Sequence, residues 1–338
     1  MMDQLDLITK NTIEIIGIEE IKKKIINKTV LIAYLQIEPI QEPSIDLLLY
    51  IIKVKDLVDA GVYVKILISD IYPYLTTEQE SDNKTFEKSI FYKTLITNIL
   101  IHLQVSNIGY EFIIGSELEL DKNYVMRLFK FMSKITVYQA QQACNKSICK
   151  PLISQLVYPM LQVLNETVLE IDIHIGSIEE KDIFELSRGF IQSLGHSLCS
   201  YLIVPVIPCI RKSLNKLIDN CKIRIIDDRE SIFTKINNSY CLEKNTNDNL
   251  SSCIAICKHI IYPLGECVGE YKTYIQFENM WKNNKMTVQE FKIHVASILN
   301  SILRPIRDSI LEYKDLYNMA FVVNQKITIN KQDNSILI

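Results

Sequence analysis

The segment from Thr29 to Ser69 reads TVLIAYLQIEPIQEPSIDLLLYIIKVKDLVDAGVYVKILIS. An apolar run that ends at Ile37 is typical of a buried strand, and residues 44–60 carry the apolar spacing of a helix. Gly61 stands where a left-handed residue closes a helix, and a second strand-like run begins at Tyr63. A strand, a helix and a strand of these lengths predict a βαβ unit with two parallel strands.

The same alternation continues on both sides of this unit. We expect helices over 6–27, 84–104, 121–144, 151–169 and 178–194, and further strands over 110–115, 172–175 and 201–207. These elements predict an α/β fold with a mostly parallel sheet.

Beyond about Ile226 the pattern changes to helices without intervening strands. The expected helices cover 228–238, 250–259, 288–311 and 314–322, and the polar tail from Asn324 is expected to fray. The change predicts two domains, an α/β domain over 1–226 and an all-helical domain over 227–338.

Composition excludes several classes of protein. The apolar share of 48% and the charged share of 23% are ordinary for a globular chain. The formal net charge of -3 gives no overall attraction to nucleic acid, so contact with an RNA needs a local basic face. No apolar run is long enough to span a membrane, and no signal peptide opens the chain. Nine scattered cysteines fit reduced thiols, and we predict no metal site and a cytoplasmic location.

Three runs of sequence resemble one known family. They are LVYPMLQVL at 156–164, KDLVDAG at 55–61 and ISDIYPYL at 68–75. The chain is similar over about 7–307 to tyrosyl-tRNA synthetases, class I enzymes, in their eukaryotic and archaeal branch. The resemblance implies a Rossmann-type catalytic domain with a dimer-forming helical insertion at about 115–170, followed by an anticodon-binding domain. Family members activate tyrosine with ATP and magnesium and transfer it to tRNA.

The match to the family's tyrosine pocket is partial. Tyr158 and Gln162 match the pair that holds the amino group of the substrate, and their spacing places both on one helix face. The family's aspartate for the tyrosine hydroxyl is replaced by Asn165, which lacks the charge and has donors of its own. The family's pocket glutamine is replaced by Glu180, whose carboxylate repels the carboxylate of the substrate. The residues expected in the pocket are Tyr34, Asp70, Tyr158, Gln162, Asn165 and Glu180.

The family's first ATP signature, Glu-Pro-Ser-Gly followed by His-Ile-Gly-His at a helix start, is degraded. Its histidines and helix N-terminus stabilise charge on the α-phosphate. Both glycines and both histidines are absent here, and Glu42 and Asp46 place negative charge where a triphosphate would lie. The positions of this degraded signature are Glu38, Pro39, Ser44 and Leu47, of which Glu38 and Pro39 keep the family residues.

The second ATP signature, Lys-Met-Ser-Lys-Ser, should lie near 215–219, where Lys216 is the single basic residue. Loss of one preorganised donor to a reacting oxyanion costs roughly 3–4 kcal/mol. We therefore predict no catalytic residue and near-background activation, unless other lysines take over. The nearest candidates are Lys53, Lys55, Lys212 and Lys216.

The family's anticodon contacts are also altered. Glu290 stands where an aspartate reads an anticodon base, although a carboxylate in the first turn is also favoured by the helix dipole. The stacking aromatic of the family is replaced by Cys267 or Val268, and stacking is worth about 1–3 kcal/mol per base.

Three functions remain open on the sequence. The first is a pseudo-synthetase that binds tRNA or a partner, as a homodimer or as a heterodimer with a synthetase subunit. The second is a divergent but active tyrosine–tRNA ligase that uses ATP with magnesium. The third is a regulatory amino-acid sensor built on Tyr34, Tyr158 and Gln162, which binds tyrosine without any effect of ATP. We predict no membrane partner for any of them.

Overall fold

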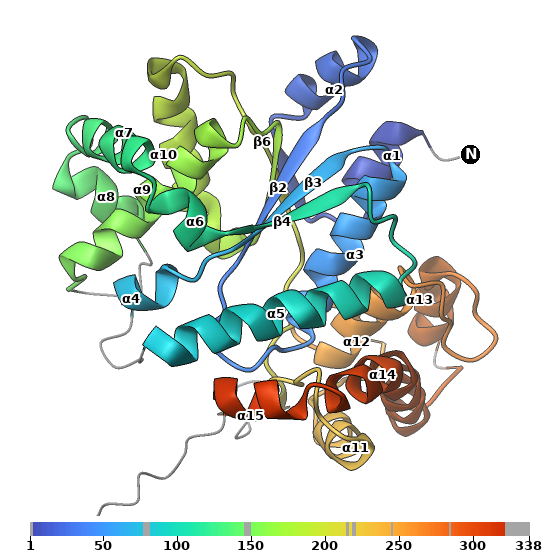
Figure 1. Cartoon of the computed structure of the whole chain (residues 1–338). Helices are drawn as coiled ribbons and strands as arrows, with labels where there is room; N and C mark the ends of the chain where they lie inside the picture. The colour runs from blue at the N-terminus through green and yellow to red at the C-terminus, as the bar shows by residue number, and fades with distance from the viewer. Residues whose placement is uncertain are drawn as a thin grey trace, which may run out of the picture.

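A six-stranded sheet forms the centre of the computed structural model, which describes residues 3–76, 82–144, 150–213, 216–217, 221–244, 246–283 and 285–321. The strand order is β1-β6-β5-β2-β3-β4, and every neighbouring pair is parallel except β1 with β6 (Figure 1). The strands are β1 (Glu14–Ile16), β2 (Ile32–Ile37), β3 (Tyr63–Ile68), β4 (Tyr110–Ile114), β5 (Ile173–Gly176) and β6 (Ser200–Ile203). The predicted α/β class and the mostly parallel sheet are confirmed.

Both faces of β2 are covered, and the two faces differ in chemistry. Ala33, Leu35 and Ile37 are buried in the core that α3 (Asp46–Asp59) and α5 (Asp82–His102) share with one face of the sheet. Side chains alternate along a strand, so Tyr34 and Gln36 point to the other face. That second face therefore receives the polar residues that carry the resemblance.

The single helix predicted over 6–27 is wrong. The chain forms α1 (Gln4–Thr9), the edge strand β1 and α2 (Ile18–Ile26) instead. Left-handed backbone at Asn11 (φ 51°) and Gly17 (φ 80°) ends helical geometry on both sides of β1. Local apolar spacing overlooked these two breaks, and pairing with β6 stabilises the strand between them.

Four helices lie between β4 and β5 and form the predicted insertion. They are α6 (Gly115–Glu119), α7 (Lys122–Met132), α8 (Val137–Ala143) and α9 (Ile153–Val168), grouped with α10 on one side of the sheet (Figure 1). The single helix predicted over 121–144 is wrong, because Thr136 and Gln139 form a capping box that starts α8 anew. In α9, Pro159 has no N–H for the Gln155 carbonyl, which accepts the Cys144 thiol instead.

The helix predicted over 178–194 is divided into three pieces. A 3₁₀ turn η1 (Ile178–Glu180) leads into α10 (Lys181–Phe190), and a second 3₁₀ turn η2 (Ile191–Leu194) follows it. The sequence also gave no sign of the short strand pair β7 (Arg211–Ser213) and β8 (Lys216–Leu217).

The C-terminal segment is helical, as predicted. It comprises α11 (Arg229–Asn237), α12 (Ser252–Ile256), the π-helical turn η3 (Cys257–Ile261), α13 (Tyr274–Lys282), α14 (Val288–Leu311) and α15 (Lys314–Phe321). The helix α13 is missing from the prediction. Buried aromatic rings of α13 and α14 pack against each other, and the tilted rings of Trp281 and Phe291 have centroids 4.7 Å apart.

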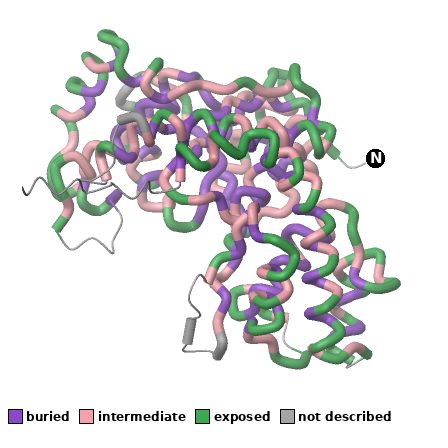
Figure 2. Tube along the Cα trace, turned by 60° about the horizontal axis from the view of Figure 1, so that its bottom comes forward, coloured by how far each residue is buried: buried purple, intermediate pink, exposed green. Residues whose placement is uncertain are grey.

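The helical segment shares its core with the α/β part of the chain. Buried residues of α12, α13 and α14 belong to the same apolar cluster as those of α3 and α5, and Figure 2 shows buried residues throughout both parts. Phe91 on α5 packs on Tyr317 and Phe321 of α15. The predicted division at 226 therefore marks a change of architecture with a continuous apolar core across it. The tail from Asn324 lies outside the described residues.

No helix in the described ranges is both long enough and apolar enough to cross a membrane.

Candidate functional site

The residues predicted to form the tyrosine pocket come together beside the strand β2. Tyr34 lies on β2, Tyr158, Gln162 and Asn165 lie on α9, and Glu180 closes the turn η1 after β5. β2 and β5 are parallel neighbours, which places η1 close to the end of β2. Ligands of open α/β sheets bind at such strand ends.

A chain of hydrogen bonds crosses this pocket. Tyr34 donates its hydroxyl hydrogen to Gln36 Oε1 at 2.5 Å, and Gln36 Nε2 donates to the Tyr158 hydroxyl at 2.9 Å. Tyr158 then donates to the carboxyl group of Glu38. Gln36 thereby links Tyr34 and Tyr158, the two phenols that the family resemblance assigns to substrate contact.

Asn165 is fully committed to its neighbours at the base of the pocket. Its Nδ2 donates to Glu119 Oε1 at 2.8 Å and to the Tyr34 hydroxyl at 3.3 Å. Its Oδ1 accepts the hydroxyl of Tyr124 at 2.6 Å. All three bonds are buried, so Asn165 has no free amide hydrogen for a ligand and its oxygen already has a donor.

Glu180 is also engaged inside the pocket. It accepts the Ser177 backbone N–H at 2.7 Å and Gln162 Nε2 at 2.9 Å. Gln162 is fully buried, and its Oε1 has no hydrogen-bond partner in the described part of the chain. Asp70, the sixth predicted pocket residue, instead anchors the start of α6 by accepting both the N–H and the hydroxyl of Ser116.

A second polar cluster lies directly beneath Tyr34. Glu166, on α9, accepts Tyr201 at 3.1 Å and the hydroxyl of Ser187, and its other oxygen contacts His174 Nδ1 at 2.7 Å. The His174 ring meets the Tyr34 ring edge-on at a centroid distance of 4.8 Å. All of these groups are buried, so the cluster fixes the position of Tyr34 from below.

Two carboxyl groups in the pocket are shifted toward the neutral form. Burial raises the pKa of Glu38 to about 7, although the hydrogen bond from Tyr158 opposes the shift. Burial also raises the pKa of Glu119 to about 7, with Asn165 opposing and Asp70 adding to the shift. Among the described residues, no lysine, arginine or histidine forms an ion pair with Glu38, Glu119 or Glu180.

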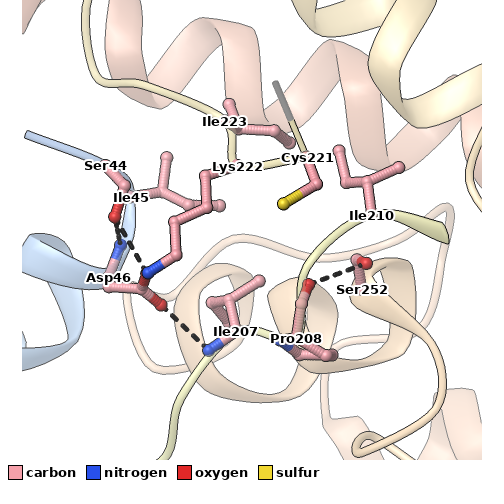
Figure 3. A pocket seen from close by; sticks show the side chains of 10 residues that line it. All are labelled: Ser44, Ile45, Asp46, Ile207, Pro208, Ile210, Cys221, Lys222, Ile223 and Ser252. Atoms are coloured by element: carbon pink, nitrogen blue, oxygen red, sulfur yellow. Dashed lines mark hydrogen bonds and ion pairs between the residues drawn. The ribbon is translucent and has the colours of Figure 1, made fainter. Parts of the chain in front are cut away.

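The start of α3, where the resemblance implies an ATP site, holds a carboxylate. Asp46 accepts the Ile207 N–H at 3.0 Å, the hydroxyl of Ser44 at 2.8 Å and Lys222 Nζ at 3.0 Å (Figure 3). The cavity between them has a volume of about 10 Å³, close to the least that holds one water molecule. Leu47, at the position of the second signature histidine, is buried in the apolar core.

The loop that leads to α3 is tied down along its length. Lys88 donates to the Ile40 carbonyl, Tyr92 donates to the Gln41 carbonyl at 2.7 Å, and Glu42 pairs with Arg224. Tyr317 of α15 donates to the same Glu42 carboxylate. Residues 43–45 also exchange backbone hydrogen bonds with 223–225. Pro39 is buried within this loop.

Of the lysines considered as replacements for the lost phosphate contacts, Lys53 is wrong. Its ammonium group donates to the carbonyls of Ile8 and Lys10 at the end of α1, and burial lowers its pKa to about 8. Lys55 forms an ion pair with Asp59 at 2.5 Å at the far end of α3. The side chains of Lys212 and Lys216, and most of the loop at 215–219, lie outside the described residues.

Glu290 is engaged in a capping box at the start of α14. Its carboxylate accepts the Thr287 N–H at 2.9 Å and the Thr287 hydroxyl at 2.8 Å. These hydrogen bonds lower the pKa of Glu290. The carboxylate stabilises the helix start, as the dipole alternative allowed.

Sequence reasoning missed Gln36, Glu119, Tyr124 and Glu166. Gln36 could have been predicted from the sequence, because it follows Tyr34 by two positions on a strand and therefore lies on the same face of the sheet. Glu166 follows Asn165 directly in the predicted helix, and a buried carboxylate needs partners. Glu119 and Tyr124 come from distant helices, so only the tertiary structure brings them to Asn165. The described residues contain no group of three or more side chains suited to a metal ion.

Comparison with known proteins agrees with this geometry. The family model described as tRNA synthetases class I (W and Y) matches residues 27–304. The chain is 30% identical over 335 residues to "Probable tyrosine–tRNA ligase, cytoplasmic" of Encephalitozoon cuniculi, covering 94% of this chain and 98% of that one. The chain belongs to the tyrosyl-tRNA synthetase family, in its eukaryotic and archaeal type.

Other members of the family extend the likeness. The cytoplasmic tyrosine–tRNA ligase of Saccharomyces cerevisiae is 26% identical, with 91% of this chain and 84% of that one covered. The crystal structure of the Archaeoglobus fulgidus synthetase complexed with L-tyrosine superposes with a TM-score of 0.82 at 26% identity, covering 91% of this chain and 98% of that one. The names of the two ligases confirm the predicted cytoplasmic location.

Proposed function

We propose that this chain is a tyrosyl-tRNA synthetase homologue with little or no aminoacylation activity, which works as a tRNA-binding or partner-binding subunit. One observation carries the proposal. The carboxylate of Asp46 occupies the start of α3, where the family holds the charge of a phosphate. Because like charges repel, a triphosphate loses affinity there as long as this carboxylate stays in place.

The surrounding contacts support the same function. Asp46 is held by a backbone N–H and by Lys222, and the loop before it is bound by Arg224 and Tyr317. Opening the site for ATP would require several of these bonds to break together. In the tyrosine pocket, the groups that would meet a substrate already bond to one another.

The insertion helices support binding of a second chain. Several large apolar side chains of this segment are exposed, and exposed apolar surface can mark a protein–protein interface. They are Leu120, Met126, Phe129, Val137, Tyr138 and Ile153. We infer that this surface forms a homodimer or a heterodimer with a catalytic synthetase subunit, and that the C-terminal helices contribute to tRNA contact.

The alternative function is an active, divergent tyrosine–tRNA ligase with ATP and magnesium as co-substrates. Lys222 favours it, since this lysine lies at the start of α3 and could transfer from Asp46 to a phosphate group. The relatives named as ligases also favour it. A tyrosine sensor would require an open pocket, which the committed hydrogen bonds of Tyr34, Tyr158 and Asn165 disfavour.

Tyrosine-dependent exchange between ATP and pyrophosphate distinguishes these functions. We expect exchange at the background rate for the full chain, with the Saccharomyces cerevisiae ligase as positive control. In parallel, tRNA binding by fluorescence anisotropy and chain association by sedimentation should each be measured over a range of salt concentrations. Robust exchange would establish the ligase, and failure to bind both tRNA and a second chain would sink the subunit function.

A further inference from the structure

One side chain bridges two phenols in the predicted amino-acid pocket. Gln36 uses its amide oxygen to accept from Tyr34 and its amide nitrogen to donate to Tyr158. Because side chains alternate along β2, Gln36 must share the polar face of Tyr34. An amino acid that enters this space has to displace the amide from both phenols.

The groups around Gln36 also select by charge. Glu38 and Glu180 lie near Tyr158, and both raise its pKa through their negative charge, after burial as the larger cause. Glu119 Oε2 and Gln162 Oε1 are buried acceptors without a partner in the described part of the chain. Orphaned acceptors and unpaired carboxyl groups favour a ligand that brings hydrogen-bond donors and positive charge.

We propose that Gln36 is the specificity-determining residue that keeps tyrosine out of this pocket, and that Glu180 directs the opened pocket to a primary arylalkylamine in preference to a zwitterionic amino acid. The proposal relies on the proposed function for the identity of the pocket. It does not depend on the state of the ATP site, which is a separate region at the start of α3.

Physical reasons make Gln36 suited to this role. A carboxamide both donates and accepts, so it satisfies two phenols that would otherwise stay unpaired in a buried site. Shortening the side chain to Ala leaves a polar space between the phenols of Tyr34 and Tyr158. An ammonium group that enters can then donate to Gln162 Oε1, whose amide nitrogen bonds to Glu180, whereas a ligand carboxylate meets the negative charge of Glu180.

Calorimetric titration of the full chain with tyrosine and with tyramine tests the proposal. Tyramine differs from tyrosine by the absence of the carboxylate, so the pair isolates the charge of interest. The variants are Gln36→Ala, Gln36→Ala with Glu180→Gln, and Gln41→Ala as matched control. Gln41 is exposed on the neighbouring loop, and its side chain makes no hydrogen bond to any residue that the structure describes.

We expect the wild-type chain and the Gln41→Ala control to bind both ligands weakly or not at all. Gln36→Ala should gain about 10- to 100-fold in affinity for tyramine, because two hydrogen bonds of the internal occupant no longer compete. Tyrosine should bind this variant several-fold more weakly than tyramine, since its carboxylate meets Glu180. The double variant should lose that preference.

Three results would overturn the proposal. They are wild-type affinity for tyrosine equal to that of Gln36→Ala, no gain for either ligand in a folded variant, and a preference for tyrosine in Gln36→Ala. If Gln36→Ala does not fold, the affinities of Gln36→Ser for tyramine and tyrosine are compared with those of the wild type, and the same three results would overturn the proposal. Pyrophosphate exchange separates the two claims, because exchange by wild type would remove the proposed function without requiring any change in the effect of Gln36.

Discussion

At the tyrosine pocket, Tyr34, Tyr158 and Gln162 stand at positions that the family resemblance assigns to substrate contact, whereas at the start of α3 the carboxylate of Asp46 stands where the resemblance implies an ATP site. Each of these three pocket side chains forms a hydrogen bond with another side chain of the same protein. At the α3 start, Asp46 accepts hydrogen bonds from the Ile207 N–H and from Lys222, and Arg224 forms an ion pair with the loop before α3. These contacts hold three segments of the chain together. The pocket side chains therefore bond to one another inside the fold, whereas the side chains at the α3 start join separate segments of the chain.

The largest expected change in stability comes from substitution of Glu166, beneath the pocket. Glu166→Ala removes the acceptor for Tyr201, Ser187 and His174, all of which are buried. We expect the free energy of unfolding to fall by about 3–5 kcal/mol, because several polar groups lose their partner. Urea denaturation measures this, with Glu166→Gln as a milder variant. A loss below about 1 kcal/mol would mean that the retained cluster does not support the core.

A pH titration of stability sharpens the comparison at Glu119. Because its folded pKa, about 7, lies above the ordinary value of 4.5, the folded state holds the proton more tightly. Its contribution to stability is therefore complete below about pH 4.5 and declines as pH rises toward 7. Glu119→Gln should be more stable than wild type at pH 8, by an amount on the order of 1–3 kcal/mol, and less pH-dependent between pH 5 and 7. The exposed Glu117→Gln serves as control, and parallel profiles for both variants would contradict the assignment.

The α3 start predicts a smaller change of stability and a gain of anion binding. Asp46→Asn keeps an acceptor for the Ile207 N–H but removes the charge, so unfolding should become easier by only about 1 kcal/mol. Inorganic phosphate or ATP should bind several-fold more tightly, measured by the rise of Tm with ligand concentration. Asp59→Asn at the other end of α3 is the matched control. Equal anion affinity in wild type and Asp46→Asn would show that this carboxylate is not the obstacle.

Glu290 gives the smallest expected effect. Glutamine also completes a capping box, so Glu290→Gln should leave the midpoint of urea denaturation unchanged. If the carboxylate only caps α14, tRNA affinity at fixed salt should stay within a factor of about two, whereas Glu290→Ala should lower the urea midpoint because the capping box is lost. A loss of tRNA affinity in Glu290→Gln without a loss of stability would restore the role as base reader.

The fold could be predicted from the sequence where burial sets a clear period. The strands β2 and β3 and the helices α3 and α14 were all found, because their apolar positions face one continuous core. The region around β1 was not, since its strand is three residues long and depends on β6 for its hydrogen bonds. Short strands of this kind are specified by tertiary pairing more than by local pattern.

The residues of the candidate site could be predicted from the sequence, but the hydrogen bonds that they form with one another could not. Family positions located Tyr34, Tyr158, Gln162, Asn165 and Glu180, and the structure brings these five together. That the pocket bonds to itself depends on Gln36, Glu119 and Tyr124, whose approach to one another requires the folded chain. At the α3 start, Asp46 was expected to oppose phosphate, and the structure adds the partners that hold it there.

The most direct test of the central claim is calorimetric titration of the full chain with a non-hydrolysable tyrosyl-adenylate analogue, with ATP titrated separately. The account predicts no measurable heat for either ligand under conditions in which the Saccharomyces cerevisiae ligase binds the analogue tightly. Tight binding of the analogue together with measurable ATP affinity would contradict the account, because it would mean that the pocket and the α3 start still form one working active site.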